Sequence, residues 1–269
     1  MLNRLTLLLL LITSTIGSSA VLAAATTPAK DPRLEKITKQ ELQRIAQKMP
    51  LGSSGHTKLL SRASRWNLAD VAYQQYTLIW KKHPESASAN LLRGLSARNY
   101  MDSLSGSLRQ KNTASALEQV ASLHQVTRSC LSKAVRLDPN SFTANLAQGF
   151  FLWQYDNQMP EGLSLMQKAV KIAPKDPRGH ATLGEVYSNR SGNAYNPQKS
   201  EEEFKTAIRL DRSYAYPLSG LVFLYVNTER YKDAQWAMKA YLKLSPPSAK
   251  VNMQIYQTAI DTGLAKQKT

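Results

Sequence analysis

The chain has 269 residues, and its 35 Lys+Arg against 19 Asp+Glu give a formal net charge of +16 at pH 7. Because Cys130 is the only cysteine, an intramolecular disulfide is excluded. The positive excess is larger in residues 26–142, with 18 basic and 8 acidic side chains, than in residues 143–269, with 16 and 11. Such a charge balance favours acidic partners and anionic surfaces.

Residues 1–25 have the layout of a secretory signal peptide, with Arg4 before an apolar run from Leu5 to Ile16 and the small residues AVLAAA after it. The run is shorter than the ~20 residues of a membrane-spanning helix, so we favour cleavage over retention as an anchor. No cysteine follows the run, which argues against a lipid anchor. We therefore expect Sec-type export, a periplasmic or secreted location and a soluble mature chain.

Residues 26–52 are expected to form a linker and an N-terminal capping helix, because RLEKITKQELQRIAQK has the apolar spacing of a helix. Residues 249–269 are expected to form a C-terminal capping helix and a tail. Caps of this kind are needed where repeated units are stacked into an array.

Similar helix endings recur between these two segments. Stretches such as LSKAVRLDPNS and MQKAVKIAPKD end at a proline, which cannot continue a helix. From Pro139 onward the stops follow one another after 35, 38 and 34 residues. Before each stop, small and large residues recur at spacings of three and four, which line one helix face. The stops are Pro84, Pro139, Pro174, Arg212 (where a proline is expected) and Pro246.

An earlier helix precedes each stop, as in ATLGEVYSN and PLSGLVFLYVN, and its small residues permit close helix packing. This order of a large residue, Leu-Gly, Tyr, Ala, an aromatic, Ala and Pro resembles the tetratricopeptide repeat (TPR) family. The clearest copy is LGEVY followed by FKTAIRLD. The resemblance implies an all-α fold of antiparallel helix-turn-helix repeats stacked in a right-handed superhelical solenoid. About five repeats are implied, at 53–86, 87–141, 143–176, 177–214 and 215–248.

The second of these repeats contains an insertion. Pro84 and Pro139 are 55 residues apart, and the extra residues begin near NYMDSLSGSLRQKNT, which is rich in Ser, Gly and polar residues. We interpret residues 101–112 as a loop and predict a long helix after it, from about Thr113 to Leu137. The loop is either a solvated connection or a segment that reaches over a binding face.

The sequence has no catalytic, cofactor or metal-binding signature. It lacks a Gly-x-Ser-x-Gly motif, a phosphate loop, a His-Glu-x-x-His motif and paired cysteines. The four histidines lie far apart along the chain, so their spacing does not indicate a metal site. We interpret Cys130 as a small buried residue on a helix, although a lone thiol outside the cytoplasm could also pair with another chain.

The resemblance implies that the first helices of the repeats line a concave groove. Asparagines could hydrogen-bond an extended peptide, and arginines could grip a carboxylate. Asn99, Asn189 and Asn227 fall at one repeat position, which Tyr155 takes in the intervening repeat. The Lys, Asn and Arg clamp of chaperone adaptors is not reproduced, and ordinary solvated helix surface is the alternative. The predicted groove residues are Arg65, Arg98, Asn99, Phe151, Gln154, Tyr155, Arg178, Glu185, Asn189, Phe223 and Asn227.

The sequence thus predicts an exported, bacterial-type TPR protein that is a non-enzymatic scaffold or adaptor in the cell envelope. Its partner would be a protein or peptide, acidic because of the charge, and nucleic acid is not expected. A second hypothesis is that the basic surface binds an anionic envelope polymer or a membrane surface. A third is an enzyme whose site lies in residues 101–112.

Overall fold

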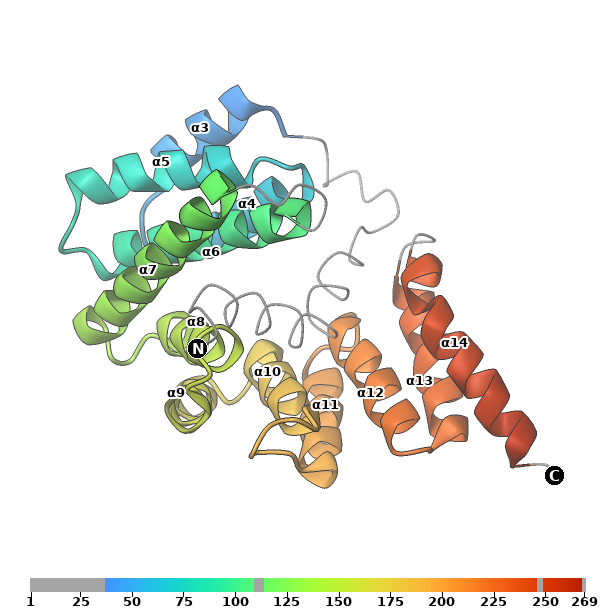
Figure 1. Cartoon of the computed structure of the whole chain (residues 1–269). Helices are drawn as coiled ribbons and strands as arrows, with labels where there is room; N and C mark the ends of the chain where they lie inside the picture. Colours follow the sequence, from blue (N-terminus) through green and yellow to red (C-terminus); the bar gives the residue numbers. More distant parts are fainter. Residues whose placement is uncertain (1–36, 109–113, 246–248, 268–269) are drawn as a thin grey trace, which may run out of the picture. The chain divides into compact units, whose positions relative to one another are not determined.

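The computed structural model describes residues 37–108, 114–245 and 249–267. Every regular element in those three ranges is an α-helix, and Figure 1 shows their order. The predicted signal segment and most of the linker after it lie outside the described residues. The helices are α3 (Lys39–Lys48), α4 (Gly55–Arg65), α5 (Ala69–Lys82), α6 (Ala87–Leu108), α7 (Ala114–Leu137), α8 (Phe142–Gln154), α9 (Met159–Ile172), α10 (Pro177–Ser188), α11 (Pro197–Leu210), α12 (Tyr216–Asn227), α13 (Tyr231–Leu244) and α14 (Ala249–Lys266).

The described helices divide into two compact units, one ending at Phe151 and the other beginning at Leu152. In both units, helices follow one another in pairs. We call α4, α6, α8, α10, α12 and α14 the first helices, and α5, α7, α9, α11 and α13 the second helices. None of the described helices combines the length and the apolar character that a membrane-spanning segment needs.

In the N-terminal unit, α3 packs against α4 and α5, and α5 packs in turn against α6. Leu42 of α3 is fully buried with Tyr76 of α5 in one apolar cluster, together with Leu59 and Leu60 of α4. Helix α3 therefore covers the start of this unit, as a capping helix does.

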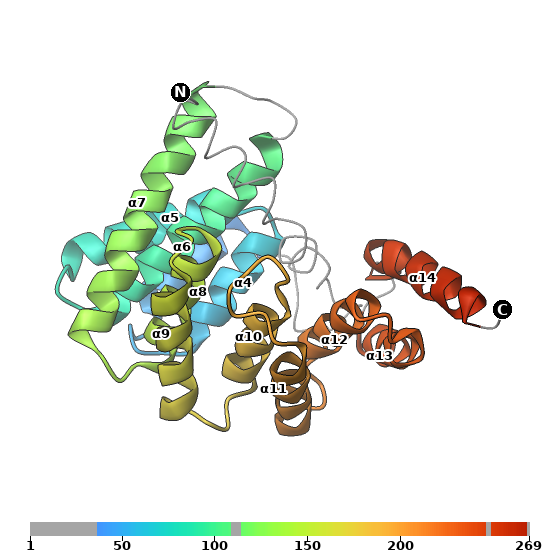
Figure 2. The ribbon, with the colours of Figure 1, turned by 60° about the horizontal axis from the view of Figure 1, so that its bottom comes forward.

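In the C-terminal unit, the first helices form one layer and the second helices another. Helix α10 contacts α12, and α12 contacts α14, while α11 and α13 pack beside them, as Figure 2 shows. Phe204 of α11, Leu221 of α12 and Tyr241 of α13 are among the buried residues of their common core, which Ile260 of α14 completes. Burial of these large side chains drives the two layers together.

Two glycines of the first helices allow the second helices to approach closely. A Cβ atom on Gly184 would lie 2.7 Å from the ring of Phe204, and one on Gly94 would lie 2.8 Å from the side chain of Leu131. Any larger residue would force the facing side chain to move. The prediction that small residues permit close packing here is therefore confirmed.

The prolines that end the second helices are fixed by a repeated hydrogen bond. The residue six positions later bonds to the prolyl carbonyl oxygen, at 2.8 Å for Asn90 on Pro84 and 2.9 Å for Asn145 on Pro139. A histidine ring nitrogen takes this place for His180 on Pro174, at 3.0 Å, and for His56 on Pro50, at 3.1 Å. Where Arg212 replaces the proline, the corresponding residue is the apolar Leu218. Pro50 is thus one more helix stop, which the sequence analysis did not include.

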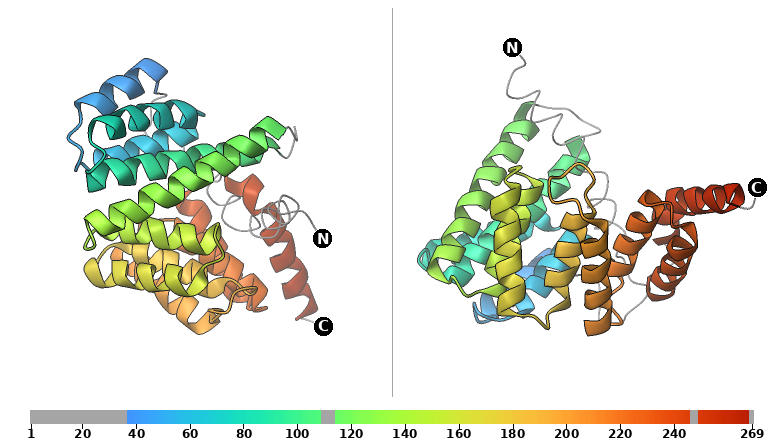
Figure 3. Two further views of the ribbon diagram at one scale, coloured as in Figure 1. Left: turned by 60° about the vertical axis from the view of Figure 1, so that its left-hand side comes forward. Right: turned by 90° about the horizontal axis from the view of Figure 1, so that it is seen from below.

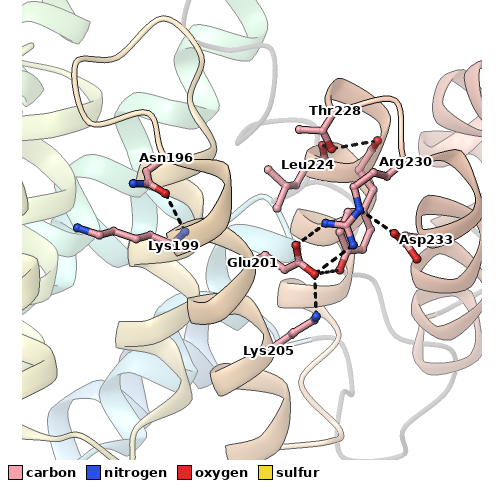
Figure 4. Close-up of polar contacts among 9 residues, drawn as sticks. Asn196, Lys199, Glu201, Lys205, Leu224, Thr228, Arg230 and Asp233 are labelled. Atoms are coloured by element: carbon pink, nitrogen blue, oxygen red, sulfur yellow. Dashed lines mark hydrogen bonds and ion pairs between the residues drawn. The ribbon is translucent and has the colours of Figure 1, made fainter.

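A polar cluster around Glu201 joins α11 to the turn between α12 and α13 (Figure 4). The Glu201 carboxylate accepts hydrogen bonds from Lys205 at 2.7 Å and from the Tyr225 hydroxyl at 2.8 Å, and it pairs with Arg230. Arg230 also pairs with Asp233 at 2.7 Å. Burial alone would raise the pKa of Glu201, but the bonds from Arg230, Lys205 and Tyr225 outweigh it and lower that pKa to about 2.

The interpretation of residues 101–112 as a loop is wrong for their first part, because α6 continues as a helix to Leu108. Ser103 and Ser105 donate their hydroxyl protons to the carbonyls of Tyr100 and Met101, so these polar residues are satisfied within the helix. Residues 109–112 lie outside the described residues. The predicted long helix is confirmed as α7, and α6 and α7, with 22 and 24 residues, pack alongside each other (Figure 3).

Candidate functional site

The predicted groove residues come from both compact units, and each unit presents its own surface of first helices, which we call its first-helix face. In the N-terminal unit these are Arg65, Arg98, Asn99 and Phe151. In the C-terminal unit they are Gln154, Tyr155, Arg178, Glu185, Asn189, Phe223 and Asn227.

In the N-terminal unit, the structure brings Arg98 and Asn99 of α6 together with Phe150 of α8. The Arg98 Nη2 donates to Asn99 Oδ1 at 3.2 Å, and the guanidinium carbon lies 5.8 Å from the centre of the Phe150 ring. A guanidinium over an aromatic face is attracted by the ring quadrupole. These three residues form one half-buried cationic and aromatic surface.

Phe151 does not belong to an accessible face. Its exposure is 0%, and its ring packs 5.0 Å from that of His124 of α7. Successive residues of a helix point about 100° apart, so a shift of one position exchanges the exposed residue for a buried one. Phe150 is the aromatic residue of this helix that lies beside Arg98.

Arg65, at the end of α4, is a second cationic donor of this unit. Its Nη1 is buried and has no hydrogen-bond partner in the part of the chain that the structure describes, and the same holds for Nε of Arg98. Burial, and then the positive charge of Arg62, lower the pKa of Arg65. Buried donors are normally bonded, so these two arginines are suited to receive an anionic group.

In the C-terminal unit, Arg178 is already paired. Its Nε and Nη2 bond to the two carboxylate oxygens of Asp176 at 3.0 and 2.7 Å, a bidentate arrangement. The hydrogen bond with Asp176 raises the pKa of Arg178. This arginine therefore carries less free positive charge than the sequence suggested.

Glu185 of α10 brings a buried acid to the same unit. It is 9% exposed and accepts a hydrogen bond from the Tyr216 hydroxyl of α12. Burial, and then the negative charge of Glu185, raise the pKa of Tyr216 well above its usual value. Tyr214 stacks on Tyr216 with ring centres 6.0 Å apart. The beginning of α12 therefore presents tyrosines rather than cations.

Phe223 of α12 is half-buried because α14 partly covers it. The Tyr256 ring of α14 meets the Phe223 ring edge to face, with centres 6.5 Å apart. An aromatic pair of this geometry contributes about 0.5–1.5 kcal/mol beyond its burial. Phe223 thus helps to pack α14 against α12, and only part of its ring is left accessible.

The asparagines lie at the ends of the first helices rather than along their middles, except in α6, which continues beyond Asn99. Asn189 is the C-cap of α10, and its Oδ1 accepts from the Ser191 backbone at 3.1 Å. The carbonyl oxygen of Asn227 accepts from Arg190 at 3.3 Å. None of the amide NH₂ groups of Asn99, Asn189 and Asn227 donates to another residue that the structure describes.

Counted from the helix stops, the position of these asparagines is taken by Gln154 in the intervening helix pair and by Arg65 in α4. Tyr155 lies one residue further along, so its assignment to this position is wrong. The position therefore holds a polar side chain with N–H donors throughout: Arg65, Asn99, Gln154, Asn189 and Asn227.

The described side chains show no arrangement for metal binding, since no group of three or more His, Cys, Asp or Glu among them could hold an ion. His56 lies between the Tyr76 hydroxyl and the Pro50 carbonyl. His180 lies between Glu203 and the Pro174 carbonyl. These two histidines fix turns and helix contacts.

An open cavity of about 470 Å³ lies between α13 and α14, lined by Tyr231, Ile255 and Gly263 among others. No predicted groove residue lines it. Tyr231, Thr258, Thr262 and Lys266 bring polar groups to its walls, but the cavity is open rather than enclosed as a typical ligand site is.

Among solved structures, the TPR protein TTC0263 of Thermus thermophilus is similar to this chain, with a TM-score of 0.58 and 16% identity over 83% of this chain and 99% of that one. The chain has the TPR fold. MamA of Desulfovibrio magneticus RS-1 is similar at a TM-score of 0.49 and 20% identity, over 78% and 96% of the two chains. Yeast Tom70 is similar at 0.44 and 14%, over 98% and 59%. No protein-family model matches the sequence, and neither does any curated protein.

The TPR fold agrees with the predicted fold class. The predicted groove residues did not include Phe150, Tyr216 and Tyr256, which are aromatic residues of the first helices. Tyr216 and Phe150 would have followed from counting every first helix from its stop, including the non-proline stop Arg212. Tyr256 lies in the C-terminal helix, which has no second helix after it in the described residues, so repetition alone gave no signal. The missed residues make the first-helix faces more aromatic than the sequence suggested.

Proposed function

We propose that this TPR protein is a non-enzymatic scaffold or adaptor that binds a partner protein or peptide along its first-helix faces. The observation that carries the proposal is that two arginines of the first helices, Arg65 and Arg98, each have a buried donor atom, Nη1 and Nε, with no hydrogen-bond partner in the described residues. A buried, unsatisfied charged donor costs more than about 1–3 kcal/mol, so a ligand that supplies an acceptor gains that energy back.

The partner that best fits this chemistry is acidic. A carboxylate satisfies two guanidinium donors at once, and Arg62 beside Arg65 adds positive charge. The NH₂ groups of Asn99, Asn189 and Asn227 can donate to backbone carbonyls of a bound segment. In the C-terminal unit, Tyr214 and Phe223 offer apolar contact, while the buried Glu185 disfavours an acidic residue directly opposite it.

The place of action that we propose is the cell envelope, after export. Residues 1–25 support this with a basic start, an apolar run and small residues, which is the order of a cleavable signal. N-terminal sequencing of the protein from cell fractions tests it, and we expect the mature chain to begin near Ala23 to Ala25. Full-length protein confined to the cytoplasm would contradict export.

Affinity capture with matched variants tests the binding proposal. The full mature chain is compared with Arg65→Gln/Arg98→Gln and with a control, Lys58→Gln/Lys82→Gln, which removes the same charge from exposed lysines of α4 and α5. Captured proteins are identified by mass spectrometry, and the purified partner is then titrated by calorimetry. We expect the arginine variant to bind at least about tenfold more weakly, since one lost charged hydrogen bond costs about 1.5–3 kcal/mol.

The control variant should bind as the wild type does. A second variant, Asn99→Ala/Asn189→Ala/Asn227→Ala, should also weaken binding without changing the preference for acidic partners. Equal affinity of all four proteins for the partner would contradict a site on the first-helix faces. A hydrolytic activity lost in the arginine variant would contradict the non-enzymatic role.

A further inference from the structure

The second helices carry a regular row of cations that the first-helix faces do not explain. The third residue before the stop of each second helix is basic, and each of these side chains is exposed. The five residues are Lys81 of α5, Arg136 of α7, Lys171 of α9, Arg209 of α11 and Lys243 of α13.

The helix dipole alone does not account for the regularity of this row. A cation in the last turn interacts favourably with the negative end of any helix. Among the first helices, α4 and α14 have such cations. The four first helices between them, α6, α8, α10 and α12, nevertheless have no basic residue in their last turns. Both sets of helices end in the same kind of dipole, yet only the second helices have a cation in every last turn, so the regularity of this row needs a further explanation.

In the C-terminal unit each second helix carries a further cation one turn earlier. Lys168 precedes Lys171, Lys205 precedes Arg209, and Lys239 precedes Lys243. Like charges three or four residues apart destabilise a helix by about 0.2–0.5 kcal/mol per pair. Lys205 is neutralised by Glu201, but Lys171, Lys239 and Lys243 form no ion pair with the described residues. An external anion would relieve this repulsion.

Large apolar side chains are exposed beside these cations. Leu210 and Leu244, next in sequence to Arg209 and Lys243, are 39% and 43% exposed, and Trp236 of α13 is 56% exposed. Trp236, Lys239 and Lys243 are spaced by three and four residues, so they share one face of α13. Tryptophan and cations together are typical of surfaces that lie at a membrane–water interface.

We propose that the C-terminal ends of α9, α11 and α13, together with the middle of α13, form a surface that docks onto anionic phospholipid. We call it the second-helix edge, and define it as Lys171, Arg209, Lys243, Leu210, Leu244 and Trp236. The cations would contact lipid phosphates, while Trp236 and the leucines would enter the headgroup region. A hydrated polyanion would use the cations but would leave the three apolar side chains in water, so the apolar residues favour lipid. The second-helix edge consists of other helices than the first-helix faces. The proposal of lipid docking can therefore be tested independently of the proposal of partner binding.

Vesicle sedimentation with the purified mature chain tests this proposal. Vesicles of phosphatidylcholine alone are compared with vesicles that also contain phosphatidylglycerol, and soluble polyphosphate is the lipid-free anion. The variant Lys171→Gln/Arg209→Gln/Lys243→Gln is compared with Arg190→Gln/Lys199→Gln/Lys266→Gln. The control residues lie at the opposite ends of the helices from the second-helix edge. There, Arg190 donates to the Asn227 carbonyl oxygen. Gln267, the neighbour of Lys266, donates to the Glu229 carbonyl oxygen.

The wild type should bind the anionic vesicles and not the neutral ones. The edge variant should bind about 100-fold more weakly, because one cation near an anionic membrane contributes about 1 kcal/mol, or about fivefold. The control should stay within a few-fold of the wild type. Equal losses in the two variants would contradict the second-helix edge and indicate a general charge effect.

Trp236 supplies a readout that separates lipid from polyanion. It is the one exposed tryptophan of the four, so its emission should shift to the blue with anionic vesicles. The shift should be missing in Trp236→Phe. Binding to polyphosphate as tight as to vesicles, with no Trp236 shift on vesicles, would overturn the lipid assignment.

Discussion

At the scale of single residues, buried amides and imidazoles fix the points where the chain turns from one helix pair to the next. Asn90 is 1% exposed, and its NH₂ group donates to the carbonyls of Pro84 and Ser86, both at 2.8 Å. Its Oδ1 accepts from the Trp80 indole at 3.0 Å. One side chain therefore satisfies two backbone carbonyls and one indole around a helix stop.

Replacement of Asn90 by Ala should destabilise the protein by about 2–3 kcal/mol, because the two carbonyls and the indole lose their partner in a buried place. Urea unfolding measures the change. Asn99→Ala on the same helix is the matched control and should cost less than about 0.5 kcal/mol, since Asn99 is less buried. Equal costs for the two variants would mean that the bond to the proline is not what stabilises the stop.

Glu201 provides a prediction about pH. Its pKa in the folded protein is about 2, below the ordinary value of 4.5, so the carboxylate stabilises the fold fully above about pH 4.5. That contribution decreases as the pH falls from 4.5 towards 2. Glu201→Gln should therefore destabilise the protein at pH 7, by about 1 kcal/mol because Arg230 and Lys205 are half-exposed.

Urea midpoints of the wild type and Glu201→Gln at pH 7 and pH 3 test this sign. The difference between the two proteins should shrink at pH 3. Glu202→Gln, an exposed neighbour on α11, should show little difference at either pH. An equal difference in urea midpoint at pH 7 and pH 3 would show that Glu201 stabilises the fold through its size and hydrogen bonds and not through its charge.

At the scale of helices, the pairing depends on a glycine of the first helix facing a large residue of the second. Gly184 faces Phe204, and Gly94 faces Leu131. Alanine has a higher helix propensity than glycine by about 1 kcal/mol, but overpacking of a buried contact costs about 1–3 kcal/mol. Phe204 is 1% exposed, so its ring has little room to move.

Gly184→Ala should therefore destabilise the protein by roughly 1 kcal/mol net, measured by urea unfolding. In the same background Phe204→Leu should cost less than it does in the wild type, because the smaller side chain makes room for the new methyl group. Gly52→Ala is the control, since a Cβ atom there meets nothing within 4 Å. Additive effects of Gly184→Ala and Phe204→Leu would contradict the close contact.

The repetition of the helices could be predicted from the sequence, but the exact faces could not. Proline stops and apolar spacing are local signals in the sequence, and they were sufficient to predict the TPR fold. The length of α6 was underestimated because Ser103 and Ser105 read as loop residues, whereas their hydroxyls bond within the helix. The pairings of Arg178 with Asp176 and of Glu185 with Tyr216 depend on side-chain placement that no local spacing encodes.

At the scale of the whole molecule, positively charged side chains occur in two kinds of surroundings, partly buried on the first helices and exposed on the second helices. On the first-helix face of the N-terminal unit, Arg65 and Arg98 have buried donor atoms that suit one carboxylate at a time. On the second helices, the cations are exposed and recur once per helix pair. A net charge of +16 is thus compatible with a selective site and a general cationic surface in one chain, and their salt dependence should differ, because exposed charges are screened more strongly.

The whole chain also has a single thiol, which decides whether disulfide-linked dimers can form. Cys130 is 3% exposed and receives a hydrogen bond from Arg93 at 3.7 Å. Burial raises the pKa of Cys130 in spite of the nearby Arg93 and Lys133 charges. A buried thiol with a raised pKa is a poor nucleophile and cannot reach a second chain.

We therefore expect the native protein to remain a reduced monomer on non-reducing gels, even after oxidant treatment. Its reaction with a thiol reagent should be at least about 100-fold slower in buffer than in urea. The double variant Ser129→Cys/Cys130→Ala moves the thiol by one position to an exposed place on α7, and it should react quickly and form dimers. Fast labelling of native wild-type Cys130 would contradict its burial. The thiol at position 129 is the control, because it meets the same reagent on the same helix with the same neighbouring charges.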